Sequence, residues 1–163
     1  MNETPSSEFR VEKHQAVAIV TLLSGATVHG CFFVASGSSR HAGAERVGDL
    51  LNAEPGFFPF EVQSGEMPGT VLYNRNQVVT VALADDEARR DPGYAVATRR
   101  FASILLSNGR RIVGTVHVYR PAGCDRLSDW ARHSDAFRYI ETDETTMLVN
   151  MAHVVEVHEV AQP

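Results

Sequence analysis

The stretch NRNQVVTV, residues 74–81, returns seventy-six residues later as NMAHVVEV, residues 150–157. In both stretches an asparagine is followed, at the same distances, by three valines. A chain that repeats an ending in this way is expected to repeat the whole structural unit before it, so that each copy predicts the structure of the other.

The two copies also agree toward the amino terminus. VAIVTLLSGATVHGCFFV (17–34) aligns with FASILLSNGRRIVGTVHV (101–118), and RVGDLLN (46–52) aligns with RLSDWAR (126–132). The matched residues occur in the same order in both copies. They are Leu22 with Leu106, Gly25 with Gly109, Val28 with Ile112, Gly30 with Gly114, Phe58 with Phe137, and Phe60 with Tyr139. We infer an internal duplication.

Alternation of apolar residues predicts two strands at the start of each copy. Both copies are apolar at every second position, at 18/102, 20/104 and 22/106 and again at 28/112, 32/116 and 34/118, so one face of each strand should be buried. The turn between the strands carries Gly25 or Gly109, which can adopt positive φ. Gly30 and Gly114 lie inside the second strand and should permit a bend or a close backbone approach.

The segments 46–52 and 126–132 are predicted to be short amphipathic helices, because their apolar residues are spaced i, i+3, i+4. Arg46 and Asp49, like Arg126 and Asp129, would be neighbours on the helix surface. We expect exposed ion pairs worth less than about 1 kcal/mol. The alternative interpretation is that these pairs recognise a partner.

The expected fold is therefore mainly β, with two tandem small barrels, each with a short helical insertion. We expect a disordered N-terminus at 1–8, a first repeat at 9–83, a polar linker at 84–94 and a second repeat at 95–160. Repeats of this size are marginal alone and should pack together. Whether they share one continuous sheet is left open.

Composition narrows the class of protein. The chain has 163 residues, 44% of them apolar, and a formal net charge of -5, which is enough apolar material for a packed core and gives no general affinity for polyanions. No apolar run approaches a membrane span, and no signal segment is apparent. We expect a cytoplasmic protein without a membrane association.

The sequence gives little sign of catalytic or metal chemistry. Neither cysteine has a partner at zinc-knuckle spacing, and the seven histidines form no H-x-H or H-E-x-x-H pattern. No G-x-S-x-G, glycine-rich phosphate loop or paired carboxylates occur in a plausible setting. We expect a protein that is not an enzyme and that carries no cofactor.

The pattern L-x-x-G-x-x-h-x-G-x-h, followed later by h-N-x-x-x-V-h-x-V (h, apolar), resembles the two signature motifs of the Sm-like family. Members of that family are strongly bent five-stranded barrels that assemble into rings and commonly bind RNA. The resemblance implies a small barrel of Sm-like or SH3-like kind for each copy, and assembly through open strand edges.

The same comparison reveals departures at the RNA-contacting positions. The family's Asp and Asn after the second strand have no counterpart in 35–39 or 119–123. Its basic residue followed by glycine is replaced by Asn74-Arg75 and Asn150-Met151. What resembles the RNA pocket therefore lacks most of its chemistry.

Three functions stay open at this point. We favour a non-catalytic interaction or scaffold protein that self-associates or binds a protein partner. Nucleic-acid binding is the first alternative, and a regulator that binds a small molecule in the cleft between the repeats is the second. The candidate binding residues are Asn74, Arg75, Asn150, Arg46, Asp49, Arg126, Asp129, Arg110 and Arg111.

Two of these sets carry their own expectations. An asparagine at a tight turn usually bonds nearby backbone groups or is left-handed, so Asn74 and Asn150 have a structural interpretation beside a role in ligand binding. Arg110 and Arg111 could join Arg99 and Arg100 in a basic patch for nucleic acid, provided that the strand between them is short or bent.

Overall fold

The computed structural model describes residues 12–38 and 41–163, and it is mainly β with antiparallel pairing throughout. The expected disordered segment 1–8 lies outside the described residues. The first half of the chain contains β1 (Lys13–Leu22), β2 (Thr27–Ala35), α1 (Val47–Ala53), β3 (Phe57–Val62), β4 (Gly69–Asn74), the 3-10 turn η1 (Arg75–Gln77) and β5 (Val78–Leu83).

The second half repeats this order of elements after η2 (Glu87–Arg90), which lies in the segment expected to be a linker. Its elements are β6 (Thr98–Leu106), β7 (Arg111–Val118), α2 (Leu127–Ala131), β8 (Phe137–Glu141), β9 (Thr146–Asn150), η3 (Met151–His153) and β10 (Val154–Glu159). The two predicted helices are confirmed, with boundaries that differ by one residue from those expected at each of their four ends.

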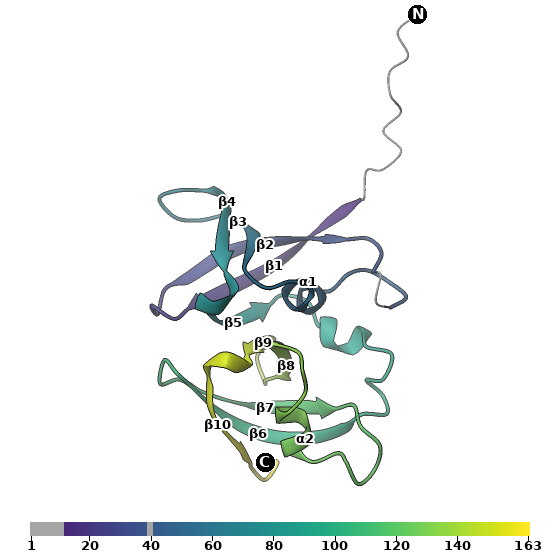
Figure 1. Cartoon of the computed structure of the whole chain (residues 1–163). Coiled ribbons are helices and arrows are strands. Elements are labelled where there is room, and N and C mark those ends of the chain that lie inside the picture. The colour runs from purple at the N-terminus through teal and green to yellow at the C-terminus, as the bar shows by residue number, and fades with distance from the viewer. Residues whose placement is uncertain (1–11, 39–40) are drawn as a thin grey trace, which may run out of the picture.

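All ten strands belong to one sheet, in the order β10-β6-β7-β8-β9-β5-β1-β2-β3-β4. This order answers the question of continuity, because β5 of the first half pairs with β9 of the second. Figure 1 shows the two halves one above the other, with β5 and β9 between them. Strands β4 and β10 are at the two ends of the sheet.

The predicted strand faces are confirmed by burial. Ten of the twelve positions expected to face the core are buried, and the other two, Leu22 and Val28, are partly buried and pack against it. The predicted turns are confirmed as well, since Gly25 has φ +89° and Gly109 has φ +82°. In each turn the glycine N–H donates to the carbonyl of the last strand residue, Leu22 or Leu106, over 2.9 Å.

Gly30 and Gly114 allow a close backbone approach between neighbouring strands. A Cβ at Gly30 would lie 2.0 Å from the carbonyl oxygen of Glu61, and one at Gly114 would lie 2.4 Å from that of Glu141. Any side chain would therefore push β3 away from β2, or β8 away from β7.

The apolar cores of the two halves interpenetrate at the central strands. Phe137 and Leu148 belong by sequence to the second half but pack in the cluster of the first half. Val79 belongs to the first half and packs in the cluster of the second. The two halves therefore stabilise each other by burying apolar surface across the β5–β9 boundary.

Candidate functional site

The contact between the halves contains many polar interactions, and it begins with β5 and β9. Thr80 is opposite Val149, and Leu83 is opposite Thr146, in an antiparallel register. Beside this ladder the Thr145 hydroxyl donates to the Leu83 carbonyl over 2.6 Å. The side chains of Val79 and Leu148 are fully buried at this boundary.

Asn150 fastens the end of this boundary. Its side-chain oxygen accepts from the N–H of Ala152 at 3.0 Å, while its amide nitrogen donates across the boundary to the carbonyls of Arg75 (3.1 Å) and Val78 (2.8 Å). The predicted structural role of this asparagine is confirmed, and its φ of -76° is not left-handed. The same amide therefore caps its own turn and joins the two halves.

Asn74 is the equivalent residue at the free edge of the sheet. Its side-chain oxygen accepts from the N–H of Asn76 at 3.0 Å, which repeats the cap made by Asn150. Asn74 lies at the end of β4, where no strand among the described residues pairs on the outer side. Within the described part of the chain, its amide nitrogen therefore has no neighbouring strand whose carbonyls it could bind as Asn150 does.

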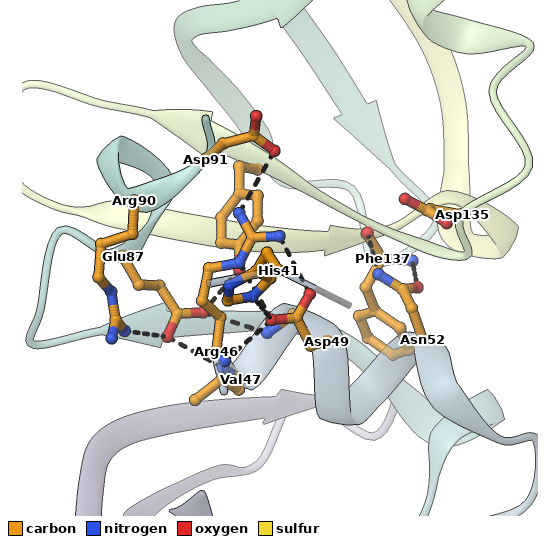
Figure 2. Close-up of polar contacts among 12 residues, drawn as sticks. His41, Arg46, Val47, Asp49, Asn52, Glu87, Arg90, Asp91, Asp135 and Phe137 are labelled. Atoms are coloured by element: carbon orange, nitrogen blue, oxygen red, sulfur yellow. Dashed lines mark hydrogen bonds and ion pairs between the residues drawn. The ribbon is translucent and has the colours of Figure 1, made fainter. Parts of the chain in front are cut away.

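Helix α1 is bound to the second half by Asn52. Its amide nitrogen donates to the Phe137 carbonyl over 2.9 Å, and its oxygen accepts from the Phe137 N–H over 2.8 Å, as Figure 2 shows. The side chain thus pairs with β8 as a strand backbone would.

Glu87 of η2 joins three elements (Figure 2). Its buried carboxylate accepts from the N–H groups of Val47 (3.0 Å) and Gly48 (3.1 Å) and from the hydroxyl of Tyr139 (2.8 Å). Burial raises the pKa of Glu87, although these three donors act in the opposite direction. The sequence predicted a polar linker over 84–94, and it did not predict that Glu87 of this segment is buried.

The Arg46–Asp49 pair is also buried, contrary to the exposed pair predicted from the sequence. Arg46 Nη2 lies 3.0 Å from Asp49 Oδ1, with 11% and 9% of the two side chains exposed. His41 Nε2 is 2.6 Å from Asp49 Oδ2, and Asp91 Oδ2 is 3.5 Å from Arg46 Nη1 (Figure 2). Burial alone would raise the pKa of Asp49, but the hydrogen bonds from Arg46 and His41 outweigh it and lower the pKa to about 2.

The ion pair predicted in the second half is not formed, since the described part of the chain shows only a backbone contact between Arg126 and Asp129. Asp129 accepts from the backbone N–H of Arg126 over 2.9 Å, and Arg126 is exposed. The halves therefore differ here because η2 and β8 cover helix α1, whereas α2 faces solvent at this position.

Two buried arginines bind backbone carbonyls in the last turn of a helix or in the chain that follows it. Arg75 donates from all three guanidinium nitrogens, to the carbonyls of Leu51 (3.1 Å), Phe57 (2.6 Å) and Leu50 (3.2 Å). Arg138, which the sequence did not single out, donates from Nε to the Asp135 carbonyl (3.1 Å) and from Nη2 to the His133 carbonyl. Arg75 is therefore a structural residue.

The arginines proposed for nucleic-acid binding do not come together. Arg99 and Arg100 pair with His117 and Val116 at one end of the β6–β7 hairpin, while Arg111 pairs with Leu105 at the other. Five or six residues of extended strand lie between these two positions, a span of about 17 to 20 Å. Arg100 and Arg111 are also engaged by Glu159 (3.3 Å) and Glu156 (3.2 Å), and Arg110 is exposed at the turn.

A cleft of about 260 Å³ lies between the halves. Arg46, Asp49 and Asn52 line it from the side of α1, and residues from the end of β7, from α2 and from β8 complete it. Within residues 12–38 and 41–163, no group of three or more His, Cys, Asp or Glu could hold a metal ion. In the same ranges no helix is long and apolar enough to cross a membrane.

The residues that sequence reasoning missed are Asn52, Glu87, His117 and Arg138. Asn52 aligns with Arg132, a residue of different chemistry, and Glu87 lies in the expected linker, so only their contacts across the boundary give these two residues a role. Comparison of the chain with protein-family models, with curated proteins and with solved structures found no match.

Proposed function

We propose that this protein is a non-catalytic interaction module, built from a duplicated Sm-like small barrel, whose chains join head to tail. In this proposal, β4 of one chain pairs with β10 of the next, as β9 pairs with β5 inside the chain. The partner is therefore a second copy of the same chain.

The observation that carries the proposal is a difference in burial between equivalent residues. Val79 and Leu148 are fully buried at the internal boundary, whereas their equivalents Val155 and Leu72 are 65% and 64% exposed. Large apolar side chains on an unpaired strand edge favour pairing with another chain. A contact between two chains with the geometry of the internal β5–β9 boundary would bury both Val155 and Leu72.

The repeat offset of 76 residues fixes the register of the proposed contact. Transferring the β5–β9 register places Tyr73 opposite Glu156, Leu72 opposite Val157, and Thr70 opposite Glu159 of the neighbouring chain. Leu72 would then pack against the core beside β10, as Leu148 packs in the core beside β5.

Such a contact joins two different surfaces, so it leaves one free edge of each kind on every dimer. Contacts of this type propagate into closed rings or open filaments. The resemblance to the Sm-like family supports a ring. The nucleic-acid alternative gains no support from the arginines, which are buried, ion-paired or far apart.

Light scattering during size-exclusion chromatography tests the proposal. The wild-type mass should be an integral multiple of 17.9 kDa that stays constant on dilution if a ring forms. Leu72→Glu damages only the β4 edge and Val155→Glu only the β10 edge, so each variant alone should be a monomer. Val113→Glu, on an exposed position of β7 inside the sheet, is the matched control and should still assemble.

Mixing the two edge variants tests the head-to-tail arrangement itself. Leu72→Glu retains an intact β10, and Val155→Glu retains an intact β4, so the mixture should give a dimer of one chain of each kind and nothing larger. Two variants that stay monomeric together would contradict the pairing of β4 with β10. A wild-type monomer at all concentrations would overturn self-association altogether.

A further inference from the structure

The cleft between the halves combines aromatic walls with charged groups. Tyr119 and Trp130 belong to its lining, together with His117 at the end of β7 and Arg138 at the start of β8. Its volume of about 260 Å³ is slightly below the range of pockets that hold drug-sized molecules. A ligand of this cleft would therefore be a small organic molecule.

Both buried side-chain polar atoms that lack a hydrogen-bond partner in the described parts of the chain belong to residues of this cleft. They are Nη1 of Arg138 and Nε2 of His117. His117 Nε2 lies 3.7 Å from Glu141 Oε2, beyond hydrogen-bond distance. Unpaired buried donors of this kind indicate a missing water or ligand, because leaving them unpaired is costly.

Comparison with Arg75 shows that the structural role of Arg138 does not require one of its nitrogens to lack a hydrogen-bond partner. Both arginines bind backbone carbonyls at or after the end of a helix, and both lie against an aromatic ring, Phe58 for Arg75 and Trp130 for Arg138. Arg75 uses all three nitrogens in this task, whereas Arg138 uses two. The third nitrogen of Arg138 therefore has no hydrogen-bond partner in the described part of the protein, although Arg138 lines the cleft.

The charges around the cleft favour a singly charged anion. Among residues 12–38 and 41–163 no carboxylate lies within ion-pair distance of Arg138, while Asp49 and Asp91 are both engaged by Arg46. A carboxylate is the planar acceptor that a guanidinium binds best. Four carboxylates also line the cleft, those of Asp49, Asp91, Asp129 and Asp135, and they would repel a phosphate dianion more strongly than a monoanion.

We propose that the cleft binds a small organic monocarboxylate, with its carboxylate at the guanidinium of Arg138 and its apolar body between Tyr119 and Trp130. Because Nη1 is closed to solvent in the free protein, binding requires a movement of the guanidinium that opens this nitrogen to the cleft. The site depends on both halves, because Arg46 and Asp49 come from the first and the other lining residues named here come from the second.

Trp130 is the only tryptophan of the chain and reports on this cleft directly. Benzoate titrated into the full-length wild-type protein should change the Trp130 fluorescence in a saturable way and raise the melting temperature. Benzamide has the same shape without the charge and should bind at least about tenfold more weakly. Inorganic phosphate, at the same concentrations, should have no saturable effect.

Two variants locate the binding. Arg138→Gln should lower benzoate affinity to that of benzamide, and Arg111→Gln, at an exposed arginine outside the cleft, should not change it. If Arg138→Gln does not fold, Tyr119→Ala, at a position 45% exposed, should weaken benzoate binding several-fold without loss of the fold. A wild-type protein that fails to bind benzoate, or binds benzamide equally well, overturns the proposal and leaves a buried water as the partner of Arg138.

Discussion

The two Arg–Asp pairs have the same spacing and capping position but different surroundings. In the first half His41, Asp91 and the backbone enclose the pair, and in the second half the pair faces solvent. Enclosure raises the contribution of the pair, because each hydrogen bond to the carboxylate is made away from water. The stability of the protein should therefore depend far more on Asp49 than on Asp129.

We predict that Asp49→Asn destabilises the fold by about 1 to 3 kcal/mol near neutral pH, and that Asp129→Asn costs less than about 1 kcal/mol. The pKa of Asp49 is lowered from 3.8 to about 2 in the folded state. Its contribution is therefore complete above pH 3.8 and is lost as the pH falls toward 2. Urea unfolding of both variants between pH 7 and pH 3 measures this, and a cost of Asp49→Asn that does not diminish below pH 3.8 would contradict it.

Glu87 provides a second test at the residue scale. Glu87→Gln would turn an amide N–H toward the donors of Val47, Gly48 or Tyr139, so we expect a loss of about 1 to 3 kcal/mol in unfolding free energy. Glu66→Gln, at an exposed position in the β3–β4 loop, is the control and should leave the urea midpoint unchanged. Equal midpoints for both variants would show that the three contacts of Glu87 do not stabilise the fold.

The strand pairs β2–β3 and β7–β8 depend on one glycine each. Gly30→Ala and Gly114→Ala would each force a methyl group into a backbone carbonyl, so each should cost about 2 to 4 kcal/mol in chemical denaturation. Gly37→Ala meets nothing within 4 Å and should cost nothing measurable. If Gly114→Ala is as stable as Gly37→Ala, the close approach to Glu141 does not exist in solution.

Helices α1 and α2 differ in how strongly they are tied to the rest of the fold. α1 is bound through Asn52 and Glu87 to β8 and η2, whereas Trp130 of α2 is buried within its own half. The short helix α1 therefore connects the halves, a role that its amphipathic pattern alone does not reveal.

At the scale of the whole molecule, one pair of variants distinguishes the internal boundary between the halves from the proposed boundary between chains. Asn74→Asp keeps the oxygen that caps Asn76 but loses both amide donors, so the monomer should keep its melting temperature while the assembly dissociates. Asn150→Asp loses the donors to Arg75 and Val78 inside the chain and should lower the melting temperature. Assembly of Asn74→Asp at wild-type strength would remove Asn74 from the proposed contact.

The sequence by itself determined the local structure of each half. Alternating apolar residues defined the buried strand faces, Gly25 and Gly109 defined the turns, and i, i+3, i+4 spacing defined the two helices. These features follow from interactions between residues close in the chain, whose period or φ requirement is visible in the sequence.

Only the tertiary structure decided which strand edges meet and which charges are buried. Backbone hydrogen bonds between two strand edges are the same for every sequence, so the sequence of β5 does not identify β9 as its partner. The burial of Arg46 and Glu87 follows from that pairing, because it brings Tyr139 of β8 against the amino-terminal end of α1. A charge on a helix or in a polar segment looks solvated until the element that covers it is known.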